Sequence, residues 1–213
     1  REGAGAHANV VLGRVGTREG SRASGGGLPA TAGVSADVTA DGLRILGTEN
    51  DAGGRAHRAR YEWAATQIPT GARVLDYGCG TGYGTKILRA AGLDATGYDV
   101  DPAAVEYGGG AAERLHTSLP AGPWGAIVVV EVLEHLNERP TSVIRRLRGL
   151  APLLLGSVPL LERPGSNPHH RWYGLYEADV AKGRRSAVFM YQSADGAISS
   201  SRDDARTLLF VVT

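Results

Sequence analysis

Short apolar runs separated by longer polar stretches run through the chain from about residue 51 onward, and they predict strands alternating with helices. The run at 126–130 is continuous and β-branched, which is typical of a strand buried on both faces of a sheet. Seven strands are expected, at about 74–75, 95–99, 114–117, 126–130, 153–158, 187–191 and 208–212.

Four stretches between these runs are typical of helices, at about 55–67, 85–91, 102–107 and 141–150. Pro69 and Gly71 end the first helix, and Pro102 opens the third. Regular alternation of strands and helices predicts an α/β fold with a Rossmann-like, doubly wound and mostly parallel sheet of seven strands. The last two strands have no obvious helix between them, so we expect them to form an antiparallel C-terminal hairpin.

The first 48 residues have a different composition, rich in Gly, Ala, Ser and Thr. We expect them to form a flexible extension, and residues 49–213 to form a single domain. Arg14, Arg18 and Arg22 fall at helical spacing, but the glycines at 13, 16 and 20 argue against a stable helix. A solvated tail is the favoured interpretation of this stretch.

Charge and cysteine content narrow the class of protein. The formal net charge of the 213 residues is +1, so no strongly charged partner is implied. The single cysteine, Cys79, excludes a disulfide within the chain and suits a reducing compartment. Neither a membrane-spanning run nor the apolar segment of a signal peptide is visible, so we expect a cytoplasmic protein with no membrane partner.

A glycine-rich loop follows the first predicted strand, with Asp76 before four alternating glycines at 78, 80, 82 and 84 and a helix behind them. Dinucleotide-binding loops have the spacing G-x-G-x-x-G, whereas this loop places Tyr83 or Thr85 at the last position. A leading carboxylate also suits a cationic ligand better than a pyrophosphate. The pattern Asp-x-Gly-x-Gly-x-Gly resembles the first motif of class I methyltransferases, and this resemblance implies S-adenosylmethionine as the cofactor.

Other positions are candidates for the same cofactor site. Asp99 ends the second predicted strand, where a carboxylate can accept hydrogen bonds from both ribose hydroxyls, and Asp101 precedes Pro102 and suits a helix cap. Cys79 is interpreted as a small residue that fits the loop, because no base stands next to it in the sequence. The expected cofactor-binding residues are Arg58, Tyr61, Asp76, Gly78, Cys79, Gly80, Gly82, Asp99, Val100, Ser118 and Glu131.

A second set of polar residues follows the fourth and fifth predicted strands. Glu131, Glu134 and His135 come directly after the buried strand, and His170 follows the fifth strand. Two carboxylates and imidazoles suit a Mg²⁺ or Mn²⁺ ion, or a carboxylate that orients a basic histidine. We therefore expect His135 and His170 as catalytic residues and all four side chains as candidate metal ligands. In the alternative without a metal, Glu or His lines the cofactor pocket or caps the next helix.

The motif Glu131-x-x-Glu134-His135 resembles two groups of enzymes, the ubiquinone-biosynthesis O-methyltransferases and the small-RNA 3′-terminal 2′-O-methyltransferases. Over a greater length, from Arg44 on, the chain is similar to methyltransferases of glycan and glycosylated natural-product biosynthesis. That similarity implies O-methylation of a sugar-containing small molecule in natural-product biosynthesis. Its basis is Glu49, His57-x-x-x-Tyr61, Asn167-Pro-His-His170 and Met190-Tyr-Gln192, and the expected acceptor contacts are Arg171, Trp172 and Tyr173.

Two alternatives stay open at this point. RNA 2′-O-methylation would use a basic and aromatic surface, which a net charge of +1 and 6% aromatic residues do not favour. A non-catalytic methyltransferase-like module is the other, because His116-Thr117-Ser118 and Trp124-Gly125 depart from the usual family pattern. A second copy of the chain, forming a homodimer, is a further partner that the sequence leaves open.

Overall fold

The computed structural model of this chain describes residues 46–181 and 186–213. The predicted extension and its arginines at 14, 18 and 22 lie outside the described residues, except for 46–48, and stay a prediction. The helices are α1 (Ala52–Thr66), α2 (Tyr83–Ala90), α3 (Pro102–Tyr107), α4 (Pro140–Arg148) and α5 (Glu177–Ala181), with short 3-10 turns η2 (Gly110–Glu113) and η3 (Leu133–His135). The strands are β1 (Arg73–Tyr77), β2 (Asp94–Tyr98), β3 (Leu115–His116), β4 (Ala126–Val130), β5 (Leu153–Pro159), β6 (Ala187–Ser193), β7 (Ile198–Ser199) and β8 (Ala205–Val212).

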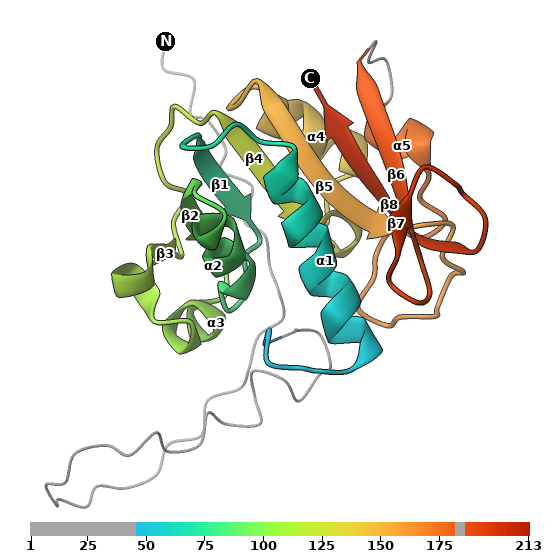
Figure 1. The fold of residues 1–213 in the computed structure, drawn as a ribbon, viewed down its shortest axis with the longest axis horizontal. Helices are drawn as coiled ribbons and strands as arrows, with labels where there is room; N and C mark the ends of the chain where they lie inside the picture. The colour runs from blue at the N-terminus through green and yellow to red at the C-terminus, as the bar shows by residue number, and fades with distance from the viewer. Residues whose placement is uncertain (1–45, 182–185) are drawn as a thin grey trace, which may run out of the picture.

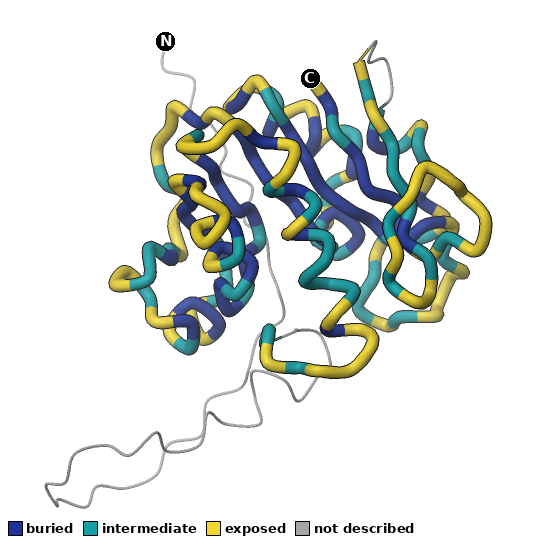
Figure 2. The backbone as a smooth tube through the Cα atoms, viewed as in Figure 1, coloured by how far each residue is buried: buried dark blue, intermediate teal, exposed yellow. Residues whose placement is uncertain are grey.

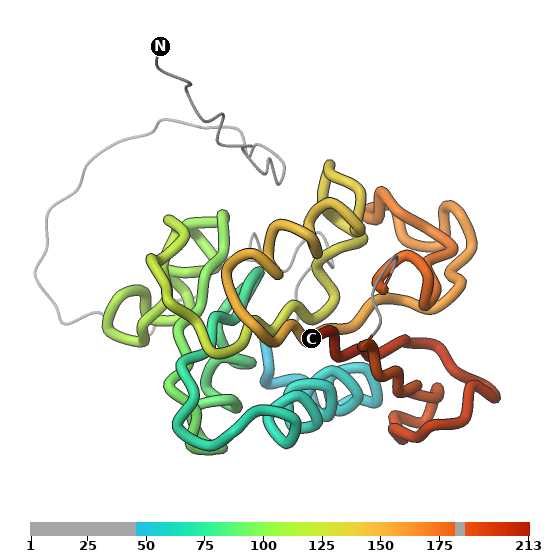
Figure 3. The backbone as a smooth tube through the Cα atoms, turned by 90° about the horizontal axis from the view of Figure 1, so that it is seen from above, coloured from blue at the N-terminus to red at the C-terminus, as the bar shows by residue number. Residues whose placement is uncertain are grey.

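All eight described strands form one sheet in the order β3-β2-β1-β4-β5-β8-β6-β7. Strands β1 to β5 run parallel to one another. Strand β8 is antiparallel to β5, and β6 is antiparallel to β8. Figure 1 shows α1 in front of the sheet and α4 behind it, and the view from above in Figure 3 places these two helices on opposite sides. The fold is therefore a three-layer, Rossmann-like α/β sandwich.

Both faces of the sheet are covered by apolar side chains, and Figure 2 shows that the central strands are buried. Val74 and Val128 belong to the cluster that packs under α1 and α2, while Leu75 and Ile127 belong to the cluster under α4. Neighbouring residues of a strand point to opposite faces, so a strand covered on both sides must be apolar throughout. This is why β4 is buried at every position, as its sequence predicts.

The predicted α/β architecture is confirmed, with three differences in detail. The helix α5 was not predicted. The sheet has eight described strands where seven were expected, because the two-residue strand β7 adds to the edge of β6. The last strand, β8, lies between β5 and β6, so both strands of the predicted hairpin join the main sheet.

Asp51 caps α1 through a 2.8 Å hydrogen bond from the Gly54 N–H. Within the described residues, the helices are too short or too polar to cross a membrane.

The order of the strands fixes where a ligand site can form. The chain moves from β1 outward to β2 and β3 and then returns to place β4 on the other side of β1. In open α/β sheets ligands bind beyond the carboxyl ends of the strands at such a reversal. The segments that leave β1 and β4 at these ends are the glycine-rich loop and Glu131–His135.

Candidate functional site

The glycine-rich loop is held against the ends of β1 and β2 by its own backbone. The N–H groups of Gly78 and Cys79 donate to the Tyr98 carbonyl at 2.7 and 3.0 Å. Gly80 N–H donates to Asp99 Oδ2 at 2.8 Å, and Asp101 N–H donates to Asp99 Oδ1 at 3.0 Å. The carboxylate of Asp99 therefore fixes the loop, and its expected contact with a ribose stays a prediction.

The four alternating positions of the loop are glycine for different physical reasons. A Cβ at Gly78 would collide with Val132 and one at Gly82 with Leu115, while one at Gly84 would fall inside the Tyr61 ring. These three positions are glycine because side chains pack against them. Gly80 is different: its φ of +54° is positive like those of Gly78 and Gly82, but a Cβ there would meet nothing within 4 Å. Open space at Gly80 is where a ligand can approach the main chain.

Asp76, at the end of β1, lies behind this loop and is completely buried. Tyr61 Oη donates to its Oδ1 at 3.2 Å, and Thr85 Oγ1 donates to its Oδ2 at 2.7 Å. Burial is the main reason that the pKa of Asp76 rises to about 7, with the nearby Asp99 charge adding to it. Both oxygens are thus used inside the protein, and the expected contacts of Asp76 and Tyr61 with the cofactor stay predictions.

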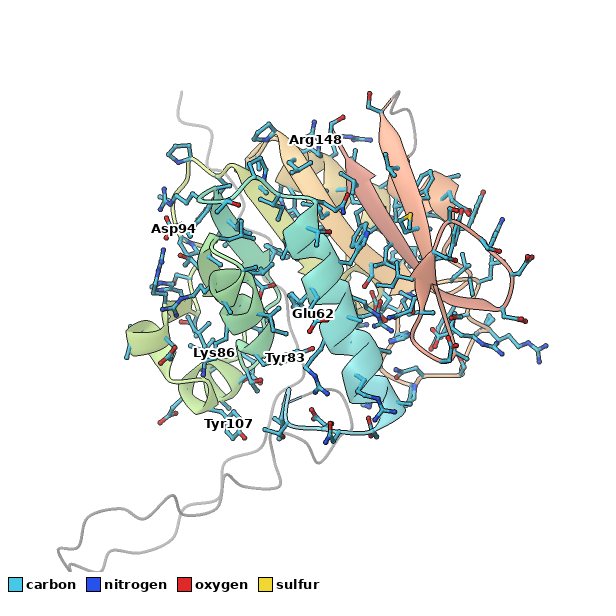
Figure 4. The ribbon with its side chains drawn as sticks, in the orientation of Figure 1. Glu62, Tyr83, Lys86, Asp94, Tyr107 and Arg148 are labelled. Atoms are coloured by element: carbon cyan, nitrogen blue, oxygen red, sulfur yellow. The ribbon has the colours of Figure 1, made fainter. Side chains whose placement is uncertain are left out.

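Residues 46–50 cross the beginnings of α1 and α2. Arg58 Nη1 donates to the carbonyls of Gly47 and Glu49 at 3.2 and 2.7 Å, which ties this segment to α1. Gly47 packs against Tyr83, which is labelled in Figure 4 at the start of α2. The rings of Tyr83 and Tyr61 have centroids 5.7 Å apart. Arg58 was predicted as a cofactor residue, and the structure shows that at least one of its nitrogens anchors this segment.

The remaining predicted cofactor residues differ in exposure. Cys79 is buried, and burial raises the pKa of its thiol, which agrees with its interpretation as a packing residue and not a nucleophile. Asp101 caps α3 by accepting a 2.9 Å hydrogen bond from Ala103 N–H, as predicted. Val100 is half-buried and Ser118 is exposed, both beyond the carboxyl ends of β2 and β3.

Glu131 follows β4 with an unusual positive φ of 51°. Ser157 Oγ donates to its Oε1 at 2.7 Å, and Arg60 Nη1 lies 3.3 Å from its Oε2. Both carboxylate oxygens of Glu131 therefore have partners on β5 and α1. Glu131 does not belong to the group of side chains described below that could hold a metal ion, so the four predicted candidate ligands are reduced to three.

Glu134, His135 and His170 form that group, with one ligand atom from each lying within 4.8 Å of the others. The Glu134 carboxylate is buried, and neither of its oxygens has a hydrogen-bond partner among the described residues. Burial, together with the charge of Glu131, raises the pKa of Glu134 well above its usual range. Two orphaned oxygens at a buried position are costly unless a ligand satisfies them.

His135 is a neutral imidazole at pH 7, because burial and the neighbouring His170 lower its pKa to about 4. Its Nδ1 lies 3.3 Å from the His169 carbonyl, to which an Nδ1–H donates. The Nε2 lone pair is then left on the side of Glu134, 4.0 Å from Oε1. The rings of His135 and His170 meet edge to face, with centroids 4.7 Å apart.

The expected acceptor contacts have mixed roles. Trp172 is fixed by a 2.8 Å hydrogen bond from Nε1 to the Leu136 carbonyl, and Tyr173 Oη donates to the Asn167 carbonyl at 2.5 Å. Arg171 is exposed, and its backbone N–H donates to the Glu134 carbonyl at 2.8 Å. Trp172 and Tyr173 therefore shape the loop around His170, and Arg171 is the one of the three that faces solvent.

Residues 52–192, more than half of the chain, match the family described as a methyltransferase domain. The chain belongs to this methyltransferase family. The resemblance to class I S-adenosylmethionine-dependent methyltransferases is thereby confirmed at the level of family and fold. Its finer placement among glycan or ubiquinone enzymes stays a proposal.

Curated relatives include two ribosomal protein L11 methyltransferases. The one from Bordetella parapertussis is 34% identical over 140 residues, covering 61% of this chain and 43% of the relative. The one from Neisseria gonorrhoeae is 38% identical over 134 residues, covering 57% of this chain and 45% of the relative. The matched part of the chain thus spans less than half the length of these relatives.

Solved methyltransferases share the fold at low identity. The magnesium protoporphyrin IX methyltransferase ChlM from Synechocystis, with bound SAM, has a TM-score of 0.57 at 19% identity and covers 85% of this chain and 98% of its own. The methyltransferase domain of bacterial CtHen1-C has a TM-score of 0.53 at 21% identity and covers 74% and 98%. At these identities the likeness shows the fold that the methyltransferase domain adopts.

Three residues of the site were missed by reading the sequence: Arg60, Thr85 and Glu162. Arg60 and Thr85 bind carboxylates that are distant in sequence, Glu131 and Asp76, and no local pattern marks such pairs. Glu162, which hydrogen-bonds His170, was more accessible to prediction. It is an acidic residue shortly after a buried strand, at the same edge of the sheet as the other candidates.

Proposed function

We propose that this methyltransferase domain transfers the methyl group of S-adenosylmethionine to a hydroxyl of a sugar-containing small molecule. The observation that carries the proposal is the Glu134–His135–His170 group, which lies just beyond β4, next to the strand that leads into the glycine-rich loop. A donor bound over Gly80 and an acceptor bound at this group would lie on neighbouring strand ends. O-methylation requires such a second centre, because a hydroxyl must lose its proton as it is methylated.

The donor side of the site fits the cofactor. The only one of the four alternating glycines with open space at its Cβ position is Gly80, and the adjoining Asp99 carboxylate is buried at the end of β2. The helix α2 begins at Tyr83, immediately after the loop, so its N-terminus faces the same region. These features support a small molecule with its polar end at the loop.

The acceptor side fits a divalent cation. Glu134 offers a carboxylate whose two buried oxygens have no hydrogen-bond partner among the described residues, and His135 offers a neutral imidazole nitrogen. Carboxylate and imidazole together suit Mn²⁺ and related divalent ions. We propose that Glu134, His135 and His170 hold such an ion. When bound, it lowers the pKa of an acceptor hydroxyl that it contacts.

The chain's own groups then have separate tasks in the reaction. Glu134, His135 and His170 orient the acceptor oxygen, and Arg60 and Ser157 keep Glu131 fixed at the end of β4. The acceptor oxygen forms a bond to the methyl carbon as the carbon–sulfur bond breaks. S-adenosylhomocysteine is the leaving group, and the hydroxyl proton passes to solvent water. The two strand ends would hold the methyl carbon and the acceptor oxygen in line, and this alignment lowers the barrier to transfer.

RNA 2′-O-methylation is the second candidate, because the ribose hydroxyl is also a sugar hydroxyl and the same three residues resemble the motif of small-RNA methyltransferases. Methylation of a protein, which the names of the curated relatives give for those proteins, is a third outcome that an acceptor assay would detect. These readings share the donor and differ in the acceptor.

Transfer of a radiolabelled methyl group to a panel of glycosides, short RNAs and ribosomal protein L11 tests the proposal. We expect labelled glycosides, loss of transfer in EDTA and recovery with Mn²⁺. Label on RNA alone selects the second candidate, and label on L11 alone overturns the sugar-containing acceptor. Full activity in EDTA would show that the reaction needs no metal ion. Nε2 of His135 would then be the group that accepts the hydroxyl proton. Absence of S-adenosylmethionine binding by calorimetry, with folded protein, overturns catalysis altogether.

A further inference from the structure

The loop between β5 and α5 is built onto η3, and it brings His170 to Glu134. The N–H groups of Arg171 and Trp172 both donate to the Glu134 carbonyl, at 2.8 and 3.2 Å. The Trp172 indole adds the hydrogen bond to Leu136 at 2.8 Å. The backbone that follows His170 is therefore placed by the same turn that carries Glu134 and His135.

Both ring nitrogens of His170 have partners in this loop. Nδ1 lies 2.5 Å from Glu162 Oε2, and Nε2 lies 3.0 Å from Asn167 Nδ2. An amide nitrogen can only donate, so Nε2 carries the lone pair, and a carboxylate oxygen accepts the hydrogen that Nδ1 carries. The two contacts independently require the same neutral tautomer of His170.

The orientation of the Asn167 amide is fixed as well. Its Oδ1 accepts a 3.0 Å hydrogen bond from the His169 N–H, which leaves Nδ2 for His170. Glu162 is also held in place, because its carbonyl accepts a hydrogen bond from Gly174 N–H at 2.9 Å across the loop. The side chain of His170 is only 7% exposed and that of Glu162 is 20% exposed, so the pair is largely shielded from solvent.

We propose that Glu162 is the positioning residue of the acceptor site: it holds His170 in the Nδ1–H tautomer so that Nε2 offers its lone pair to a ligand. Asn167 occupies that lone pair until a ligand takes its place. His135 is oriented in the same way by the His169 carbonyl, so both imidazoles carry their hydrogen on Nδ1. A second oriented nitrogen beside the Glu134 carboxylate is what a metal ion needs from a histidine pair.

The inference rests on the proposed function for its consequence, but its central statement concerns the ligand-free protein. Nitrogen-15 NMR of histidine-labelled protein reports the tautomer directly, and a His170→Gln sample assigns the signals. We expect protonated Nδ1 and unprotonated Nε2 for His170 in the wild type. Protonated Nε2 in the wild type overturns the inference, whatever the enzyme methylates.

Two variants test the role of Glu162. Because Asn167 selects the same tautomer, both variants are made together with Asn167→Ala. In that background Glu162→Ala should release His170 into a mixture of tautomers, whereas Glu162→Gln keeps an acceptor oxygen and should retain the Nδ1–H form. Glu177→Gln is the matched control. Glu177 also accepts a side-chain hydrogen bond, from Tyr191 Oη at 2.6 Å, and does not contact His170. An unchanged His170 tautomer in the folded variant that carries both Glu162→Ala and Asn167→Ala contradicts the proposal, and if that variant does not fold the wild-type spectrum still decides.

Calorimetry with Mn²⁺ alone separates this inference from the proposed function. We expect Glu162→Ala to weaken Mn²⁺ binding by roughly 10- to 100-fold, as is usual when the partner of a ligating histidine is removed. Glu177→Gln should bind as the wild type does. Wild-type protein that binds no Mn²⁺ overturns the metal in the proposed function, while the tautomer result stands on its own. Equal Mn²⁺ affinity in wild type and Glu162→Ala contradicts a positioning role.

Discussion

The guanidinium of Arg60 lies 3.3 Å from Glu131 Oε2 and also donates to Gln192 Oε1 at 2.7 Å and to Thr207 Oγ1 at 3.1 Å. One side chain of α1 thereby joins the end of β4 to β6 and β8. Gln192 is itself anchored to α1, since its Nε2 donates to the Ala56 carbonyl at 2.9 Å. The helix before the glycine-rich loop and the C-terminal strands are thus connected through one polar network beside the candidate acceptor site.

Removal of Arg60 should destabilise the fold. Arg60→Ala leaves the Glu131 carboxylate, whose side chain is only 18% exposed, without its cation, and we expect a loss of about 3 kcal/mol in the free energy of unfolding. Urea denaturation measures it. Arg89→Ala is the control, because the Arg89–Glu113 pair is exposed and should contribute less than about 1 kcal/mol. Equal losses of unfolding free energy in the two variants would show that the Arg60 network stabilises the fold no more than an exposed ion pair does.

Two glycines of the loop should respond differently to alanine. Gly80→Ala places a methyl group in the open space over the loop, so we expect at least a tenfold weaker binding of S-adenosylmethionine by calorimetry, with a backbone cost of about 1–2 kcal/mol from the positive φ. Gly84→Ala forces the Tyr61 ring to move, and its main effect should be a loss of about 1–3 kcal/mol in stability. The prediction fails if Gly80→Ala binds the cofactor as tightly as the wild type.

Asp76 should make stability depend on pH. Its pKa in the folded protein is about 7, above the unfolded value of 3.8, so its contribution is fully present below pH 4 and is lost as the pH rises through 7. The shift corresponds to a difference on the order of 4 kcal/mol. Asp76→Asn removes this titration, and the difference in unfolding free energy between variant and wild type should change from pH 5 to pH 8 in favour of the variant.

The pH experiment has a matched control in Asp94→Asn. Asp94 is paired with Arg114 at 2.7 Å, but its side chain is 46% exposed. Its substitution should give a difference from the wild type that changes little between pH 5 and pH 8. A similarly flat difference for Asp76→Asn contradicts the burial-driven rise in the pKa of Asp76.

Mn²⁺ should stabilise the protein through Glu134. A ligand at about 100 times its dissociation constant stabilises the folded state by about 2.7 kcal/mol, which is a rise of several degrees in the melting temperature. Thermal unfolding with and without Mn²⁺ measures this rise. Glu134→Gln should abolish the effect, whereas Glu138→Gln, which alters the partly exposed pair with Arg146, should retain it. A rise of the same size in Glu134→Gln places the ion elsewhere.

Much of the fold was accessible from local patterns. The β-branched run at 126–130 became the fully buried β4, and Asp101 before Pro102 became the cap of α3, because both depend on neighbours in sequence. The extra strand β7 and the insertion of β8 between β5 and β6 were not predictable in this way. They depend on backbone pairing between segments whose side-chain pattern is compatible with several partners.

In the candidate site, too, some features follow from the local sequence and others from contacts between distant segments. The sequence by itself determined that a glycine-rich loop follows β1 and that Glu134, His135 and His170 follow neighbouring strands, since parallel strands place their carboxyl ends at one edge. Tertiary structure decided which carboxylates are already used: Asp76 by Tyr61 and Thr85, and Glu131 by Ser157 and Arg60. It also supplied Glu162 as the partner of His170. Hydrogen bonds between distant segments satisfy buried charges, and only the packed chain shows which of those charges remain for a ligand.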